Sequence, residues 1–188
     1  MISNQIYITE CPRDAMQGIK NFIPSEIKIN YLNALLKVGF DKIDFGSFVS
    51  PKAIPQLKDT AYVLENLDLD EKRSKLLAII ANERGALEAV KFDSIDYLGF
   101  PFSVSETFQQ KNTNASLEDA LSRIEKIQNH CNLNNKELQV YLSMGFGNPY
   151  GDMWSPEIVL EWVRKLTQMG IKHIALSDTI GISNYDNI

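Results

Sequence analysis

The chain has 188 residues, which is long enough for one domain with a buried core. Its net charge is −5, and no cluster of five or more Lys and Arg residues occurs, so we expect no nucleic-acid partner. Apolar runs fall short of the roughly 18 residues that a membrane span requires, so we expect no membrane partner and no signal peptide. The two cysteines, Cys11 and Cys131, lie too far apart for a zinc motif or a disulfide framework, which favours a cytoplasmic location.

Predicted strands and helices alternate along the chain. Strands are indicated by short apolar and β-branched runs, and helices by apolar residues that recur at helical spacing. In chain order, the predicted strands cover residues 5–10, 42–47, 75–80, 94–100, 138–146 and 172–180, and the predicted helices cover 25–40, 54–67, 83–92, 116–133 and 155–170. The alternation predicts about six strand–helix units.

Several helix ends carry capping signals. Ser25 is the expected N-cap of the first long helix, and Gly39 is expected to end it in the left-handed conformation. Ser116 and Asp119 form a cap pattern three residues apart. Ser155 before Pro156 is a further expected N-cap.

Strands separated by helices predict parallel pairing with right-handed crossovers, either in an open doubly wound sheet or in a (β/α) barrel. A G-x-G-x-x-G phosphate motif is absent after the first strand, and polar residues follow nearly every predicted strand. In a barrel, those strand ends converge on one mouth, where catalysis takes place. We therefore expect a (β/α)₈ TIM barrel of α/β class. The chain supplies roughly its first six units, as a single domain over 1–188 that is incomplete at its C-terminal end.

Arg13 and Asp14 directly follow the first predicted strand. An RD pair is commonly a salt-bridged turn, but a position at the end of a strand favours a functional site. Arg offers a fixed fork of donors for a carboxylate or an enolate, and Asp can ligate a hard divalent cation. Asp44 lies within the second predicted strand, and we expect it to point inward because helices cover the outer face.

Three loops also contain candidate residues. The stretch 103–116 reads as a polar loop, in which Lys111 and Asn112 can contact phosphate or carbonyl groups or simply face solvent. The glycine-rich stretch 145–152 is either a turn or a tight loop beside a ligand. Asp178, at the end of the last predicted strand, is either a helix cap or a residue of the mouth.

Four segments together resemble one family. The quoted stretches "ECPRDAMQ", "GFDKIDFGSFVSPKAIPQL", "SETFQQKNTNASLEDAL" and "IALSDTIG" are similar, in this order, to 3-hydroxy-3-methylglutaryl-coenzyme A lyases. The loop "SFVSPKAIPQ" is the most diagnostic of them. The wider superfamily of metal-dependent acyl-CoA lyases and Claisen-type synthases shares the RD pair, but usually lacks that loop.

The resemblance implies cleavage of 3-hydroxy-3-methylglutaryl-CoA to acetyl-CoA and acetoacetate, with Mg²⁺ or Mn²⁺ as cofactor and an acyl-CoA as substrate. It implies that Asp14 is a metal ligand and that Arg13 binds the thioester carbonyl and stabilises the enolate. Gln17 would hold Arg13, and Asp44 occupies a catalytic acidic position that is usually Glu. The positions implied to line the mouth and bind substrate are Ser47, Asn82, Asn112 and Asp178.

The family takes two His ligands, an Asn ligand and a catalytic Cys from its last two strands, and this chain has no HxH motif. We expect these parts, with the remaining metal ligands, beyond Ile188. Two alternatives stay open: a Claisen-type acyl-CoA condensing enzyme of the same superfamily, and an inactive barrel fragment that lacks the His and Cys residues. We also expect a homodimer.

Overall fold

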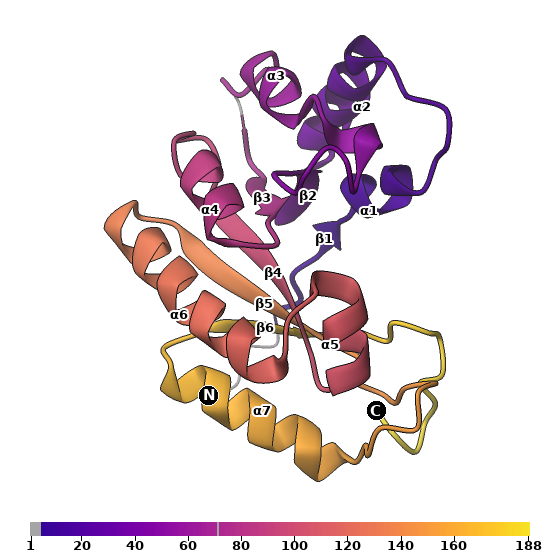
Figure 1. The fold of residues 1–188 in the computed structure, drawn as a ribbon. Helices are drawn as coiled ribbons and strands as arrows, with labels where there is room; N and C mark the ends of the chain where they lie inside the picture. Colours follow the sequence, from indigo (N-terminus) through magenta and orange to yellow (C-terminus); the bar gives the residue numbers. More distant parts are fainter. Residues whose placement is uncertain (1–4, 71) are drawn as a thin grey trace.

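The computed structural model describes residues 5–70 and 72–188 (Figure 1). Helices follow strands along this part of the chain, and none of its helices is long and apolar enough to cross a membrane. The strands are β1 (Thr9–Glu10), β2 (Lys42–Ser47), β3 (Lys75–Ile79), β4 (Tyr97–Ser103), β5 (Glu137–Ser143) and β6 (His173–Leu176). The helices are α1 (Pro12–Gln17), α2 (Ser25–Val38), η1 (Pro55–Leu57), α3 (Thr60–Glu65), α4 (Glu83–Ala89), α5 (Glu106–Thr113), α6 (Leu117–Leu133) and α7 (Pro156–Gln168).

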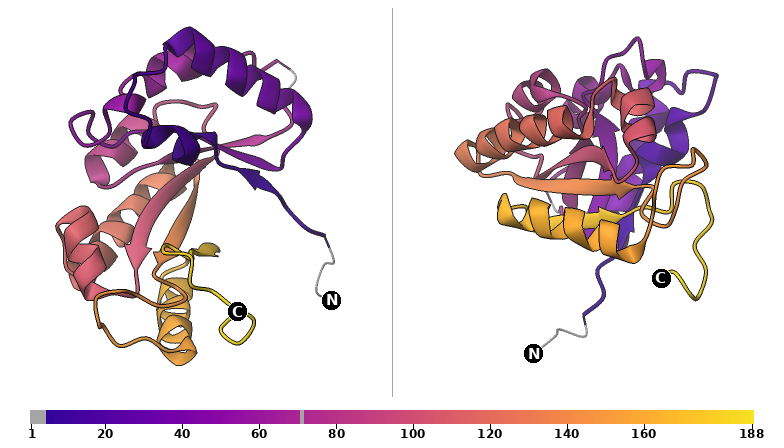
Figure 2. Two further views of the ribbon diagram at one scale, coloured as in Figure 1. Left: turned by 90° about the vertical axis from the view of Figure 1, so that its right-hand side faces the viewer. Right: turned by 60° about the horizontal axis from the view of Figure 1, so that its bottom comes forward.

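The strands form one six-stranded sheet in the order β1-β2-β3-β4-β5-β6. Every neighbouring pair is parallel, from Thr9 beside Lys42 at one edge to Leu142 beside Leu176 at the other. Figure 2 shows that the sheet curves and that the helices cover its convex side. This arrangement is a partial TIM barrel, so the predicted fold class is confirmed.

The convex face of the sheet carries the main core. Its buried residues alternate along each strand and pack against the helices. On the strands these residues are Ile43, Phe45, Leu76, Ala78, Leu98, Phe100, Phe102, Leu138, Val140 and Leu142. Phe100 and Phe102 are fully buried in this layer.

On the concave face of the sheet, side chains of the neighbouring strands pack tightly around Gly99 of β4. A Cβ on Gly99 would lie 2.5 Å from Ile79 Cδ1, 3.0 Å from Tyr141 Cε2 and 3.1 Å from Leu77 Cδ2. These side chains alternate with the outward-facing core residues, so they fill the inside of the curve. Glycine at this position is what lets three neighbouring strands pack closely there.

Most capping predictions match the observed helix ends. Ser116 and Asp119 form a reciprocal capping box at α6, and Ser155 accepts a hydrogen bond from the Ile158 amide at the start of α7. Gly39 ends α2 with φ 90°, in the left-handed region. The prediction for Ser25 is wrong: Pro24 is the N-cap, and the Ser25 hydroxyl instead donates to Asp59 Oδ2 at 2.7 Å.

The two edge strands are much shorter than predicted. The first was predicted over 5–10, but β1 pairs with its one neighbour, β2, through Thr9 and Glu10 only, and Ile6 is exposed. The last was predicted over 172–180, and β6 ends at Leu176. Both strands lie at the edges of the sheet, where one neighbour instead of two holds the backbone in the ladder.

Residues 103–116 contain a helix, so the prediction of a polar loop is wrong there. Ser105 accepts a hydrogen bond from the Phe108 amide, and Asn114 adopts the left-handed φ of 48° that ends the helix. Asp152, from a later loop, accepts bonds from the Ser105 hydroxyl and from the Thr107 amide. This support comes from 45 residues away in the chain, which local sequence pattern does not reveal.

Candidate active site

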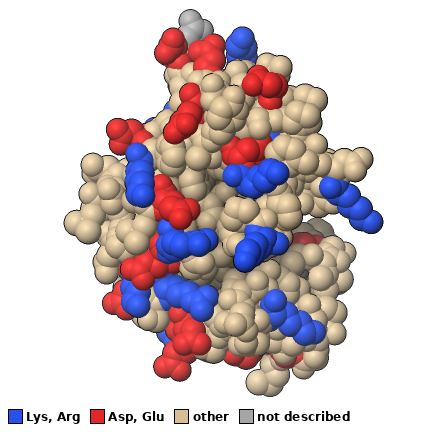
Figure 3. Space-filling model, turned by 45° about the horizontal axis from the view of Figure 1, so that its top comes forward, with Lys and Arg blue, Asp and Glu red and all other residues tan. Residues whose placement is uncertain are grey.

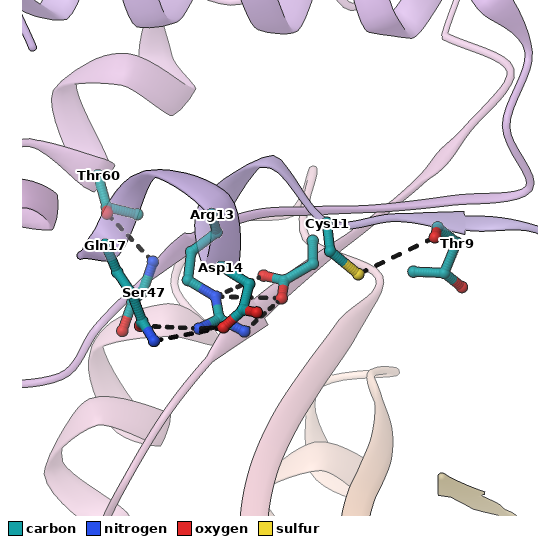
Figure 4. Close-up of polar contacts among 8 residues, drawn as sticks. Thr9, Cys11, Arg13, Asp14, Gln17, Ser47 and Thr60 are labelled. Atoms are coloured by element: carbon teal, nitrogen blue, oxygen red, sulfur yellow. Dashed lines mark hydrogen bonds and ion pairs between the residues drawn. The ribbon is translucent and has the colours of Figure 1, made fainter. Parts of the chain in front are cut away.

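Helix α1 presents a cluster of polar side chains beside strand β2, at the end of β1 (Figure 4). Pro12 occupies the first turn, where a missing N–H costs nothing, and the helix begins directly after β1. Arg13 and Gln17 are four residues apart on α1 and therefore lie on one side of it. That side faces Asp44 of β2, so a contact forms between residues that are 31 positions apart.

Arg13 and Asp44 form a buried ion pair. Arg13 Nη2 lies 2.6 Å from Asp44 Oδ2, and Arg13 Nε lies 3.1 Å from both carboxylate oxygens. The side chain of Asp44 is 1% exposed and that of Arg13 is 11% exposed. A fork of this kind fixes the guanidinium plane as well as its position. Asp44 therefore points inward, as expected from the sequence.

The other side of the guanidinium is held by α1 itself. Arg13 Nη1 donates to Asp14 Oδ1 at 3.1 Å and to Gln17 Oε1 at 2.9 Å, and Gln17 Nε2 donates to the same Asp14 oxygen at 3.3 Å. A guanidinium has one N–H on Nε and two on each terminal nitrogen. Within residues 5–70 and 72–188, one Nη2 N–H is left with no acceptor. The cluster thus holds Arg13 rigidly and leaves a single donor for a ligand oxygen.

Burial and charge act against each other in this pair. Desolvation raises the pKa of Asp44 above its ordinary value, and the hydrogen bonds and charge of Arg13 oppose that rise. Burial lowers the pKa of Arg13, but the hydrogen bond and charge of Asp44 outweigh burial, so its pKa is raised. Arg13 therefore stays a cation over the whole physiological range.

Tyr141 belongs to the same concave face and was missed by the sequence interpretation. It lies on β5, packs against the space left by Gly99, and is electrostatically coupled to Asp44, Cys11 and Arg13. Burial raises the pKa of its hydroxyl, so Tyr141 stays neutral. Its position in strict alternation with the outward-facing Val140 and Leu142 was the available signal.

Ser47 ends β2 near the Arg13 cluster and is buried (Figure 4). Its amide donates to Thr60 Oγ1 at 3.1 Å, and its hydroxyl accepts from the Val49 amide at 3.2 Å. These bonds fix the loop after β2, which starts at the mouth.

The other three predicted mouth residues are not in contact with Arg13. Asn82 caps α4 by accepting from the Gly85 amide, and Asn112 is exposed on α5. Asp178 accepts from the amides of Ile182 and Ser183, both at 2.9 Å, which stabilises a turn instead of a helix. A hydrogen bond from the Ser183 side chain, together with those two amide bonds, lowers the pKa of Asp178 to about 2. The roles of these residues in substrate binding remain predictions.

The glycine-rich stretch 145–152 is a tight loop. Asn148 Oδ1 accepts from the amides of Tyr150 and Asp152, and Gly147 takes a φ of 129° that favours glycine. A Cβ on Gly147 would lie 2.6 Å from Ile182 Cδ1, so the C-terminal segment packs directly on this loop.

The residues present do not by themselves fit a complete site for Mg²⁺ or Mn²⁺. Asp14 is 64% exposed, and only its Oδ1 is hydrogen-bonded within the described part of the chain. Hard divalent cations need several oxygen or nitrogen ligands. Among the described residues, no group of three or more His, Cys, Asp and Glu side chains is placed to hold a metal. Asp14 can supply one ligand only.

The curved parallel sheet is that of a partial TIM barrel, and it holds a fixed Arg13 directly after β1 that is paired with the buried Asp44 within β2. The sequence model of the HMGL-like family matches residues 5–188. The chain belongs to the HMGL-like family.

Similar proteins agree with this assignment. The chain is 35% identical over 173 residues to hydroxymethylglutaryl-CoA lyase YngG of Bacillus subtilis, covering 92% of the chain and 57% of that protein. It is 32% identical over 171 residues to the cytoplasmic 3-hydroxy-3-methylglutaryl-CoA lyase of Rattus norvegicus, covering 91% of the chain and 49% of that protein. The chain thus spans about half the length of these relatives.

Solved structures are similar over nearly the whole chain. The HMG-CoA lyase of Bacillus subtilis matches with a TM-score of 0.91 at 33% identity, over 98% of this chain and 62% of that one. An HMG-CoA lyase from Acinetobacter baumannii, solved with coenzyme A and 3-methylmalate, matches with a TM-score of 0.88 at 29% identity, over 98% and 60%.

Proposed function

We propose that this chain is the Arg-bearing part of a carbon–carbon lyase that cleaves 3-hydroxy-3-methylglutaryl-CoA, or a close 3-hydroxyacyl-CoA, to acetyl-CoA and acetoacetate. One observation carries the proposal: among the described residues, Arg13 is fixed on two sides and keeps a single unused donor beside the concave face. A rigid donor of this kind is suited to an oxygen on which negative charge develops.

In the proposed reaction, the hydroxyl of the substrate loses its proton and becomes the carbonyl of acetoacetate. The carbon–carbon bond breaks, and its electron pair moves to the thioester as an enolate. Protonation of the enolate carbon then gives acetyl-CoA. Arg13 would donate to the enolate oxygen, and Asp44 would keep the guanidinium in place because it binds Nε and Nη2. No co-reactant is required.

A divalent cation, Mg²⁺ or Mn²⁺, is part of the proposal. When bound, it would supply Lewis-acid activation of the substrate's hydroxyl. Asp14 is the one candidate ligand in this cluster, and the remaining ligands would come from beyond Ile188. A homodimer, and a cytoplasmic location compatible with the free thiols of Cys11 and Cys131, are further parts of the proposal.

The test is an acetoacetate assay with 3-hydroxy-3-methylglutaryl-CoA and Mg²⁺ or Mn²⁺, applied to the 188-residue chain and to any longer product of the same reading frame. Acetoacetate and acetyl-CoA in equal amounts are expected. A parallel assay mixes acetyl-CoA with 2-oxo acids and measures free thiol, which reports the condensing reaction. Thiol release without acetoacetate would support the condensing alternative, and no activity in either assay would support an inactive chain.

A further inference from the structure

A buried glutamine holds the segment that follows α1. Gln56 lies in η1 and is 4% exposed. Its Nε2 donates to the carbonyls of Ile19 and Asn21, and its Oε1 accepts from the Ile23 amide, each at 2.9 Å. A primary amide has two donor hydrogens and one acceptor oxygen, so both donors and the acceptor are in use. Gln56 therefore holds three backbone groups of residues 18–24, which join α1 to α2.

A buried lysine of α2 fixes the main chain of Gln56. Lys28 is 2% exposed, and its Nζ donates to the Gln56 carbonyl and to Asp59 Oδ1. The ring of Phe22, with its centroid 4.2 Å from the same Nζ, packs against the cation. Figure 3 shows Lys and Arg side chains on the surface of one face, with carboxylates among them, so a lysine with almost no solvent contact is an exception. A buried polar network whose groups have partners is rigid, so it holds η1 in one place.

The same short helix, η1, is tied to the strand that carries Asp44. Thr60 Oγ1 donates to the Leu57 carbonyl at 2.8 Å and accepts from the Ser47 amide at 3.1 Å. Ser47 is the last residue of β2. Gln56 is thus connected to β2 on one side and to the end of α1 on the other.

Helix α1 depends on such contacts because it is short. It has six residues, fewer than two turns, and a helix of that length is not stable by itself in water. Its last residue, Gln17, accepts from Arg13 Nη1 at 2.9 Å, and the Ile19 amide donates to the Met16 carbonyl at 3.0 Å. Ile19 is therefore bonded both to α1 and to Gln56. Loss of the Gln56 contact would release the end of α1 that holds Arg13 Nη1.

We infer that Gln56 is a positioning residue for Arg13. It keeps the C-terminal end of α1 against the loop after β2, so that Gln17 and Asp44 hold the guanidinium from opposite sides. The effect passes through Ile19 and Gln17, because the side-chain hydrogen bonds of Gln56 go to residues 19–23. The consequence for catalysis rests on the proposed function, whereas the effect on the position of Arg13 does not.

The test is hydrogen exchange in the folded 188-residue chain, followed by NMR, which requires no turnover. Two probes report on the cluster: the Arg13 Nε–H in the ion pair and the Ala15 amide, which is hydrogen-bonded within α1. The reference is the Ile80 amide, which donates to the Gly99 carbonyl at 2.9 Å in the core of the sheet. A loss of global stability accelerates all three, whereas a local release of α1 accelerates only the two probes.

The test variant is Gln56→Met, which keeps the length of the side chain and removes its donors and acceptor. A second variant, Gln56→Glu, keeps the size and an acceptor for the Ile23 amide but loses the amide donors, and it is measured as well in case Gln56→Met does not fold. The matched control is Gln109→Met in α5, because Gln109 is 1% exposed and its Nε2 also donates a buried hydrogen bond, to Thr113 Oγ1 at 2.6 Å. Circular dichroism verifies that each variant is folded.

In Gln56→Met, exchange at Arg13 Nε–H and at the Ala15 amide should rise about tenfold or more relative to Ile80, because one lost hydrogen bond is worth roughly a factor of ten in an opening equilibrium. Gln56→Glu should accelerate the same two probes while the Ile23 amide stays protected. Gln109→Met should leave both ratios unchanged. In a chain that forms acetoacetate, Gln56→Met should also lower kcat about tenfold or more with a smaller change in KM, because the donor is misplaced.

The inference is overturned if the Gln56 variants accelerate exchange in residues 19–23 alone, because Gln56 would then hold only that segment. It is also overturned if Gln56→Met and Gln109→Met change the two ratios alike. Faster exchange at Arg13 in a chain without lyase turnover would support the positioning role and remove only the proposed reaction.

Discussion

The guanidinium of Arg13 and the carboxylate of Asp44 form one buried unit that joins helix α1 to strand β2. Three of the contacts between them are 3.1 Å or shorter, and Asp44 is 1% exposed. Removing either partner leaves the other buried without its counter-charge, which costs far more than losing a surface ion pair. The pair is therefore a structural element as well as a candidate catalytic one.

The variant Arg13→Met should lose stability in a pH-dependent way. The loss of a buried partner should cost about 3 kcal/mol near neutral pH, measured by urea unfolding. Arg13 opposes the rise in the pKa of Asp44, so the variant should raise that pKa further above the ordinary value of 3.8. A carboxyl pKa that is raised in the folded state stabilises that state when the pH lies below the ordinary pKa. This stability is lost as the pH rises through the folded-state pKa. The double variant Arg13→Met/Asp44→Asn should recover much of the loss, and an equal or larger loss in the double variant would contradict the coupling.

The variant Gly99→Ala should destabilise the concave face. A new Cβ would lie 2.5 Å from Ile79 Cδ1 and 3.0 Å from Tyr141 Cε2, so these side chains must move. We expect a loss of about 1–3 kcal/mol in thermal or urea unfolding, as for other overpacked sites. Gly18→Ala is the matched control, because nothing lies within 4 Å of its Cβ position and its φ is −84°. That control should be neutral or slightly stabilising, and equal losses in both variants would refute close packing at Gly99.

Asp178 should make the order of the segment after β6 dependent on pH. Its carboxylate accepts from the Ile182 and Ser183 amides, and its pKa is lowered from 3.8 to about 2. A lowered pKa means that this stabilisation is complete above the ordinary value and is lost as pH falls from about 4 to 2. Hydrogen exchange of the Ile182 and Ser183 amides should accelerate over that range. The Asp178→Ala variant should show fast exchange at every pH, and slow exchange in that variant would rule out the proposed bonds.

The sequence predicted the strand–helix alternation because each element carries its own period and its own end signals. Ser116, Ser155 and Gly39 act within a few residues, so local pattern was enough to predict the helix ends that they form. The predictions failed where a contact with a residue far along the chain determines the local structure. Ser25 bonds to Asp59 instead of capping its own helix, and α5 gains support from Asp152.

The candidate site was partly predictable for the same reason. Strand ends in a parallel barrel meet at one mouth, so Arg13 and Asp44 were expected on the same side of the sheet. Their bidentate contact and the proximity of Tyr141 depend on side-chain packing between distant segments, and the bond that Arg13 donates to Gln17 holds the guanidinium in place for that contact. Asn82 and Asp178 show that a polar residue at a strand end is often engaged by nearby backbone amides.

The most direct test of Arg13 as the enolate-stabilising donor is the turnover of 3-hydroxy-3-methylglutaryl-CoA by the Arg13→Lys variant. Lysine keeps the positive charge but lacks the fork that binds Asp44 and the fixed donor beside it. We predict that kcat falls by about a hundredfold or more relative to the parent, as for other removed oxyanion donors, with a smaller change in KM. Turnover of Arg13→Lys equal to that of the parent would contradict the role assigned to Arg13.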